Sequence, residues 1–473
     1  MTNKTKVYNI ELFKRLLEYV KSYNNIFIVS VFSVVGLSVF GALRPVVLKK
    51  IVDENLTQSS YDFFLEYILL MALLLVMEVL SNYSFIYNAG FLGQSVVKDI
   101  RVKLFNHIQK FKMKYYDKSS VGILITRAVT DMERIADIFG QGLFMILSDI
   151  LKMLIVAIVM ITMNWELSII VFISLPFILL ATKVFQKYMK LAFDEVRNEV
   201  ANLNSFVQER VTGINILQLF AREKVEYEKF KLINERHKKA WLKTVWYNSI
   251  FFPVAEIFSS LTLGLVVWYG GMNTVLDNTA SLGELTAFIM MIPMLFRPLN
   301  QIANKFNTLL MGMVAAERVF KILDTESKIK DNGLKIADNI MGKIKYENVH
   351  FSYNSSEKVI EDFNLEIKAG TTNAIVGATG SGKSTIIKLL NRFYEINEGE
   401  IYIDDINIKN YKISSLRKNI GFVSQDVHLF SDSILNNITL KNSKIPFLRV
   451  KNAAKEIQID DFISSLPEGY NYN

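Results

Sequence analysis

Cysteine is absent from the 473-residue sequence, and histidine occurs four times. The absence of cysteine excludes disulfide bonds and thiolate metal sites, and it carries no information about the compartment. The histidines are scattered along the chain, without the close spacing that metal ligands need; they are His107, His237, His350 and His428. We also expect no cleavable signal sequence, because the N-terminus is polar and the first apolar run lacks a small-residue cleavage pattern.

Internal repeats and low-complexity tracts are also absent, whereas hydrophobic residues are abundant, at 51% of the chain. They lie mostly in the first 310 positions, which predicts a membrane domain followed by a polar domain. The net charge of +8 is compatible with a nucleic-acid partner. The basic residues, however, cluster in loops between apolar spans, where a cytoplasmic location explains them. We therefore expect a bilayer and no nucleic acid as the surroundings of this chain.

Six apolar segments are long enough to cross a bilayer. Their expected extents are 26–48, 63–88, a third segment that ends near 163, 167–185, a fifth that ends near 269, and 282–310. Asn164, Trp165 and Glu166 form a short predicted turn between the third and fourth spans. The second span continues as a helical pattern well beyond the bilayer. The fourth is followed by a polar helical stretch over 186–243. The pattern predicts six spans with two long extensions on one side.

Charge decides the orientation of these spans. The loops after spans two and four are long and basic, and the other connections are short and poor in lysine and arginine. The positive-inside rule then places both termini in the cytoplasm of a multi-pass inner or plasma membrane protein. The predicted divisions are 1–25 with an interfacial helix over 10–22, a membrane domain over 26–310, a linker over 311–342, and a soluble domain over 343–473.

The strongest motif is GATGSGKST, which fits Gly-x-x-x-x-Gly-Lys-Ser. Thr372–Val376 is predicted to be a buried strand and Ser384–Asn391 a helix, which is the setting that a phosphate-binding loop requires. The glycines allow backbone N–H groups to converge on polyphosphate, Lys383 reaches the outer phosphates, and Ser384 is the expected Mg²⁺ ligand. The candidate loop residues are Gly377, Ala378, Thr379, Gly380, Ser381, Gly382, Lys383, Ser384 and Thr385.

Five of the charged residues within the predicted spans are candidates for a transport cavity, because they lie deep in the bilayer: Glu78, Asp149, Lys152, Glu256 and Arg297. Charges at that depth are costly toward lipid and are expected to face the bundle interior. Lys152 follows Asp149 by three residues, a spacing that permits an ion pair on one helix face. We predict a polar belt in a transport cavity, with adaptable apolar surface from Met290, Met291 and Met294. Internal ion pairs that only hold helices together are the alternative, and the methionines are also compatible with plain packing.

Four segments of the chain match, in order, the patterns of one family. They are YYDKSSVGILITRAVTD (Tyr115–Asp131), QERVTGINILQLFARE (Gln208–Glu223), LFRPLNQIANKFN and LRKNIGFVSQDVHLFSDSILNNI. With six spans and a phosphate loop, the chain resembles an ATP-binding cassette exporter half-transporter of the bacterial multidrug and lipid exporter branch. The resemblance covers nearly the whole chain. It implies an α-helical six-span transmembrane domain followed by an incomplete α/β phosphate-loop nucleotide-binding domain.

The resemblance also assigns roles to single residues. It implies that Tyr353 stacks on adenine, although a strand aromatic packed in the core is the alternative. It implies that Gln425 contacts Mg²⁺ and senses the γ-phosphate, whereas a loop amide without a ligand is the other interpretation. Ser424 stands where the family usually has proline. The two cytoplasmic extensions would carry short coupling helices with turns at Gly122 and Gly213; solvated surface helices are the alternative.

As an activity, the resemblance implies ATP-driven export of a small molecule, drug or lipid by a homodimer or heterodimer that binds MgATP. The alternative is a nucleotide-binding membrane partner without transport. The sequence ends at Asn473, where the family continues to a Leu-Ser-Gly-Gly-Gln-like signature, an acidic strand with its general base, and a switch histidine. We therefore expect no catalytic carboxylate or switch histidine in this chain, and no ATP hydrolysis by the chain alone.

Overall fold

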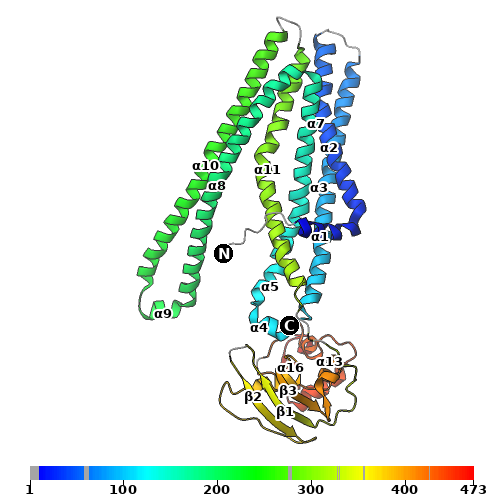
Figure 1. Ribbon diagram of the computed structural model, residues 1–473, viewed down its shortest axis with the longest axis vertical. Helices are drawn as coiled ribbons and strands as arrows, with labels where there is room; N and C mark the ends of the chain where they lie inside the picture. Colours follow the sequence, from blue (N-terminus) through cyan, green and yellow to red (C-terminus); the bar gives the residue numbers. More distant parts are fainter. Residues whose placement is uncertain are drawn as a thin grey trace. The chain divides into compact units, whose positions relative to one another are not determined.

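The computed structural model describes residues 10–57, 63–274, 280–326, 329, 331–354, 357–425 and 427–473. The chain divides between residues 328 and 329 into two compact units, which we call the helical unit and the sheet unit. Figure 1 shows the long helices of the first and the small sheet of the second. Each unit is described by itself.

The helical unit contains α1 (Ile10–Val20), η1 (Lys21–Tyr23), α2 (Asn24–Lys50), η2 (Ile51–Thr57), α3 (Phe64–Ile108), α4 (Met113–Lys118), α5 (Val121–Ala128), α6 (Thr130–Asp137), η3 (Ile138–Leu143), α7 (Phe144–Met163), α8 (Trp165–Thr212), α9 (Ile214–Leu219), α10 (Glu223–Met272) and α11 (Leu282–Leu323). Six helical runs in the described residues are long and apolar enough to cross a membrane. The predicted six-span architecture is therefore confirmed.

Small residues allow helices of the helical unit to pack closely. A Cβ on Gly93 of α3 would lie 2.8 Å from the carbonyl oxygen of Ala136 in α6. A Cβ on Gly312 of α11 would lie 2.3 Å from a side-chain carbon of Ile138. At such close approach there is no space for a side chain, so only glycine, whose side chain is a hydrogen atom, fits at these two positions. These contacts flank a core that includes the fully buried Phe139 of η3 and is formed by α1, α2, α3, α5, α6, η3, α7 and α11.

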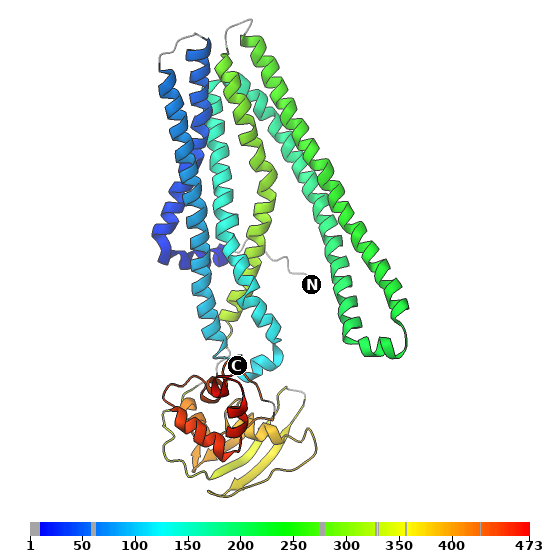
Figure 2. The same ribbon diagram turned by 180° about the vertical axis from the view of Figure 1, so that it is seen from behind.

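The helices α8 and α10 form an antiparallel pair that runs apart from the other helices toward α9 (Figures 1 and 2). Stacked rings of Phe185 and Phe251, 3.9 Å between centroids, hold the pair together. The polar stretch predicted to be helical over 186–243 is divided between three helices, because α8 ends at Thr212, the short α9 follows, and α10 begins at Glu223. Gly213 caps α8, as expected for a turn glycine, whereas Gly122 lies in the first turn of α5 and does not mark the break.

The predicted turn before α8 is shorter than expected. Asn164 alone separates α7 from α8, and its side-chain oxygen accepts a hydrogen bond from the N–H of Leu167 at 3.1 Å. An asparagine that caps a helix in this way satisfies one of the free donors of the first turn. Trp165 and Glu166 therefore already belong to the helix.

The sheet unit contains β1 (Ile344–Phe351), β2 (Ile360–Ile367), α12 (Lys383–Leu390), β3 (Glu398–Ile403), β4 (Ile406–Asn407), η5 (Ile408–Asn410), α13 (Ile413–Lys418), α14 (Ile434–Thr439), α15 (Phe447–Glu456), α16 (Asp460–Ser465) and η6 (Gly469–Asn471). The strands form one antiparallel sheet in the order β2-β1-β3-β4. Apolar side chains of β1 and β3 pack against α12, as the buried Val349, Ile401 and Leu389 show. This confirms an α/β unit after the six spans.

Two expected strands are absent from the part of the chain that the structure describes. One is 372–376, before the phosphate loop, and the other is the short strand that the pattern NIGFVSQD predicts from residue 419 on. Neither 372–376 nor the described residues 419–425 pair with a neighbouring backbone. Val376 and Val423 are correspondingly 91% and 96% exposed. An apolar run becomes a buried strand when ladder partners and covering layers are present. Hydrophobicity alone predicted these strands, and the pairing they need is missing.

Candidate functional site

The phosphate loop of the sheet unit leads directly into α12. Gly380 and Gly382 both have φ of +88°, a conformation that side-chain-bearing residues rarely adopt. A Cβ on Gly382 would also lie 3.2 Å from the carbonyl oxygen of Val359. The sequence therefore folds back here because glycine stands at both positions, and the N-terminus of α12 follows immediately. This is the backbone arrangement that presents N–H groups to an anion.

Lys383 extends back over this loop. Its ammonium donates hydrogen bonds to the carbonyl oxygens of Gly377 at 2.8 Å and Ala378 at 2.7 Å. The ammonium is thus held at the phosphate loop by neutral acceptors, which anionic phosphate oxygens would replace with stronger, charge-assisted bonds. Ser384, the first residue after it, is exposed and free to reach a metal ion.

The next residue connects the loop to the predicted adenine-binding aromatic. Thr385 is 5% exposed, and its hydroxyl lies 3.1 Å from the hydroxyl of Tyr353. The Tyr353 ring packs edge-on against Phe351 and Tyr394, with centroid distances of 4.9 and 5.0 Å. These contacts place Tyr353 beside the loop and are also what a packed core aromatic would make. Stacking on adenine stays a prediction.

Two further observations bear on Mg²⁺. Gln425 is exposed in a segment without regular structure. Among the described residues, no cluster of three or more carboxylate or histidine side chains is arranged to hold a metal ion. Mg²⁺ is commonly held by few protein oxygens together with phosphates and water. The exposed Ser384 hydroxyl at the start of α12 fits that kind of site, whereas the role of Gln425 stays a prediction.

In the helical unit, four of the five predicted intramembrane charges line one pocket of about 400 Å³, which we call the charged pocket. Its residues come from α2, α3, α7 and α11: Arg44, Glu78, Asp149, Lys152, Met290, Pro293, Met294, Arg297, Pro298 and Gln301. Glu256, by contrast, is exposed on α10 and is not part of this lining. Met291 is fully buried in the core instead.

Both carboxylates of the charged pocket are held in ion pairs between helices. Arg44 of α2 donates to Glu78 of α3 at 2.8 Å. Lys305 of α11 donates to Asp149 of α7, and both of these side chains are at least four-fifths buried. The expected pairing of Asp149 with Lys152 is therefore wrong, because the neighbouring helix supplies a lysine at closer range. Arg44 and Lys305 were missed because they lie near the ends of their apolar runs.

The two remaining cations of the charged pocket form no ion pair in the part of the chain that the structure describes. They are Lys152, which is half-buried, and Arg297, which is exposed. The side chain of Lys152 reaches toward α2, where a Cβ on Gly41 would lie 3.8 Å from its Cε. The pocket is therefore positive overall.

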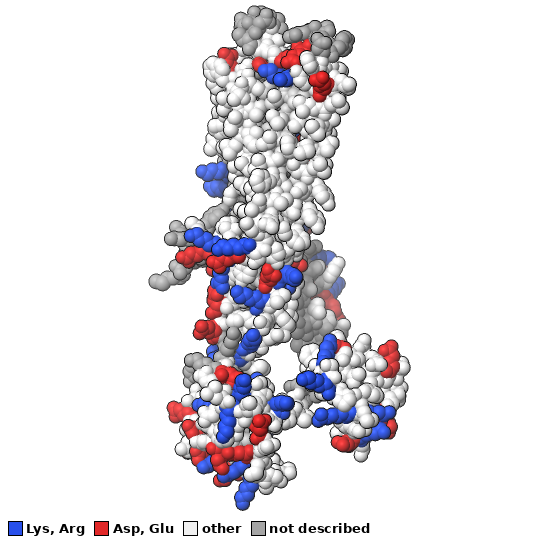
Figure 3. All heavy atoms as spheres, turned by 90° about the vertical axis from the view of Figure 1, so that its right-hand side faces the viewer, with Lys and Arg blue, Asp and Glu red and all other residues white. Residues whose placement is uncertain are grey.

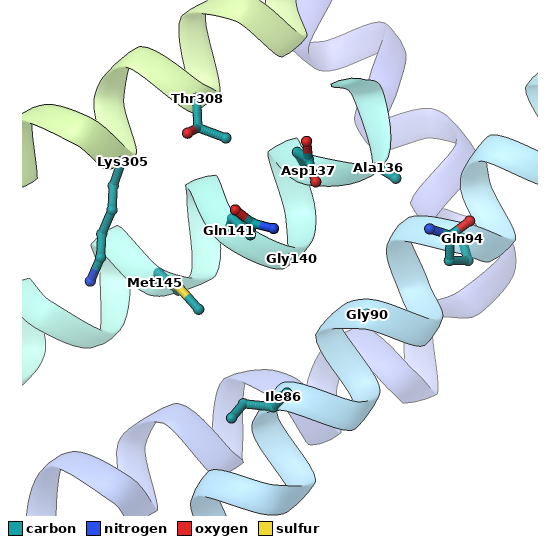
Figure 4. A pocket seen from close by; sticks show the side chains of 10 residues that line it. All are labelled: Ile86, Gly90, Gln94, Ala136, Asp137, Gly140, Gln141, Met145, Lys305 and Thr308. Carbon is teal, nitrogen blue, oxygen red and sulfur yellow. The ribbon is translucent and has the colours of Figure 1, made fainter. Parts of the chain in front are cut away.

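A second pocket, of about 570 Å³, lies between α3, α6, η3, α7 and α11. Figure 4 shows its lining: Ile86, Gly90, Gln94, Ala136, Asp137, Gly140, Gln141, Met145, Lys305 and Thr308. Lys305 belongs to this lining and also pairs with Asp149 of the charged pocket, so the two pockets adjoin at that ion pair. The π-helical η3 contributes Gly140 and Gln141, and such distortions of α-helices are frequent at functional sites.

Comparisons with known proteins match both units. Residues 27–299 match the family model of the ABC transporter transmembrane region, and residues 360–471 match the ABC transporter model. An uncharacterized ABC transporter ATP-binding protein of Bacillus subtilis is 31% identical over 468 residues, which cover 98% of this chain and 77% of the relative.

Two further relatives carry more specific names. An ATP-dependent lipid A-core flippase of Pseudoalteromonas translucida is 29% identical over 464 residues, covering 98% of this chain and 80% of the relative. A putative multidrug export ATP-binding/permease protein of Bacillus subtilis is 30% identical over 467 residues, with 97% and 80% covered.

Proposed function

Because the chain belongs to the ATP-binding cassette transporters, we propose that it is one half of a dimeric exporter that uses ATP to move a small molecule, drug or lipid across the cell membrane. The observation that carries the proposal is the presence, in one chain, of a phosphate loop and of a six-span unit with charged groups in an internal pocket. The names of the lipid A-core flippase and multidrug export relatives agree with this substrate range.

MgATP fits the sheet unit through the residues of the loop. Bound MgATP would supply the phosphates and the metal. The backbone of Gly377–Gly382 would bind the phosphates, Lys383 would exchange its carbonyl partners for phosphate oxygens, and Ser384 would bind Mg²⁺. Tyr353, beside Thr385, would orient the base.

We further propose that both termini lie in the cytoplasm, where ATP is available. The face of the helical unit in Figure 3 shows few charges along the middle of the long helices and more toward their ends. The two extensions, over 98–134 and 183–243, carry most of the basic side chains of the helical unit, which favours the cytoplasmic side for them. Dimerisation follows from the family relationship, and the choice between a homodimer and a heterodimer is left to experiment.

A second candidate function is nucleotide binding without transport. The exposure of Val376 and Val423 favours this second function. Val376 precedes the phosphate loop and Val423 precedes Gln425, and neither segment pairs with a strand of the sheet. Precise placement of catalytic groups generally depends on rigid elements. The two candidates share the phosphate loop and differ in whether nucleotide drives movement of a substrate.

Inside-out membrane vesicles that contain the protein test both candidates. ATP-dependent accumulation of fluorescent amphiphiles, lost in Lys383→Ala and retained in Lys388→Ala, would support export. Lys388 is the matched control because it lies on α12 but outside the loop. Nucleotide photolabelling without accumulation would support the second candidate. Absence of labelling in the unmodified protein would contradict both.

A further inference from the structure

We propose that the charged pocket takes an amphipathic organic anion, with its negative group between Lys152 and Arg297 and its apolar body against Met290 and Met294. This inference rests on the proposed export function, because it names the substrate class of that same helical unit. Its basis is the balance of charge inside the pocket, together with the distribution of apolar side chains along α11.

The carboxylates of the pocket are already neutralised. Glu78 holds Arg44 at 2.8 Å, and Asp149 holds Lys305. A cationic ligand would have to displace one of these partners and leave it without a counter-charge. Removing one partner from a buried pair is strongly unfavourable, because the other charge remains buried and uncompensated. The arrangement therefore disfavours a cation.

The cations of the pocket are in surplus. Lys152 and Arg297 form no ion pair among the described residues. Glu78, which lies near Lys152 at Gly41, already pairs with Arg44. The Nε of Arg44 is also buried without a hydrogen-bond acceptor. Cations at membrane depth are costly unless they meet an anion, backbone carbonyls or water. A carboxylate, sulfonate or phosphate group would accept charge-assisted hydrogen bonds from Lys152 and Arg297 together.

The apolar side of the pocket follows from one face of α11. Met290, Pro293, Met294 and Pro298 recur at helical spacings of three, four and eight residues and all line the pocket. Methionine is unbranched and polarisable, so it fits apolar groups of different shapes. A volume of about 400 Å³ falls in the range of small-molecule sites. Cations and methionines together select a ligand that is both anionic and apolar.

The cysteine-free chain allows a direct test. Met294→Cys, labelled with bimane in nanodiscs of zwitterionic phosphatidylcholine, would report ligand arrival in the pocket. The probes are tetraphenylborate and tetraphenylphosphonium, which share their shape and differ in the sign of their charge. A second reporter, Leu69→Cys on the exposed face of α3, records partitioning of the ions into the lipid.

We expect a saturable response to tetraphenylborate at position 294 and an affinity at least tenfold weaker for tetraphenylphosphonium. Lys152→Gln and Arg297→Gln should each weaken anion binding about tenfold or more, because each removes one charge-assisted contact. Lys152→Arg and Arg297→Lys should retain it, which separates charge from folding.

Equal or tighter binding of the phosphonium, unchanged anion binding in both glutamine variants, or no saturable response to either ion would overturn the inference. ATP-dependent accumulation in vesicles would then still uphold the proposed export function. If the anion binds as expected and no substrate accumulates, export fails as the function and the pocket keeps its anion specificity.

Discussion

The ion pair between Asp149 and Lys305 allows the two interpretations of the intramembrane charges to be separated. Both side chains are at least four-fifths buried, so breaking the pair leaves one charge without compensation. Removal of one partner from a buried pair typically costs about 3 kcal/mol. The helical unit spans 328 residues, and an unfolding entropy of about 2.1 cal/mol/K per residue converts that cost to a fall of about 4 °C in the unfolding midpoint.

The test compares Asp149→Asn, Lys305→Met and the double variant in detergent at one fixed scan rate, because membrane proteins often unfold irreversibly. Each single variant should lower the midpoint by about 4 °C, whereas the double variant should lose less than the sum of the two. Lys152→Met is the matched control. It removes a cation from the same pocket that has no ion-pair partner among the described residues, so it should leave the midpoint nearly unchanged.

Two outcomes would refute this reasoning. Strict additivity of Asp149→Asn and Lys305→Met would show that the two groups do not interact energetically. An equal loss in Lys152→Met would show that all charges in the pocket act as structural pairs, which would also remove the surplus cations on which anion binding depends.

Three further predictions concern other parts of the chain. Lys383→Ala should abolish nucleotide photolabelling, because the outer phosphates lose their point charge; undiminished labelling would contradict the assignment. Gly93→Val should lower the stability of the helical unit by about 1–3 kcal/mol, since its Cβ would meet the Ala136 carbonyl oxygen at 2.8 Å; an unchanged midpoint would argue against this close packing. Lys441, 2.6 Å from Asp432, lowers the pKa of that carboxyl to about 2. The resulting stability should be present above pH about 4 and be lost as pH falls toward 2, and a pH titration of unfolding in which Asp432→Asn behaves like the unmodified protein would contradict it.

The helices were predictable because their signals are long. A mainly apolar segment as long as 63–88 predicts a spanning helix, and the basic pattern that follows continues the same helix, α3. The break at Gly213 was placed by the family resemblance, since one glycine within a polar helical pattern is by itself compatible with either a turn or a continuous helix. The prediction of strands at 372–376 and 419–425 was wrong because strand formation depends on partner strands elsewhere in the chain.

The charged pocket shows the same limit. Depth within a span predicted that Glu78, Asp149, Lys152 and Arg297 face the interior, and the structure gathers them in one pocket. Their partners could not be predicted, because periodicity fixes the face of each helix and leaves open which helices are neighbours. The inward orientation expected of Glu256 stays a prediction, because this residue lies outside the lining of the charged pocket. The α8–α10 pair diverges from the other helices, and Glu256 is exposed there.

The helix α11 joins the pocket to the end of the helical unit. It contributes Met290 and Met294 to the pocket and then Lys305, and its C-cap residue is Asp324. Arg15 of α1 donates two hydrogen bonds, of 2.7 and 2.6 Å, to the carboxylate of Asp324. That guanidinium holds the pKa of Asp324 below its usual range. Pro293 and Pro298, both within the pocket lining, each remove one hydrogen bond from the backbone ladder of α11. Bending is therefore least costly at the point where a ligand would bind, and the chain continues from the anchored end of α11 into the sheet unit.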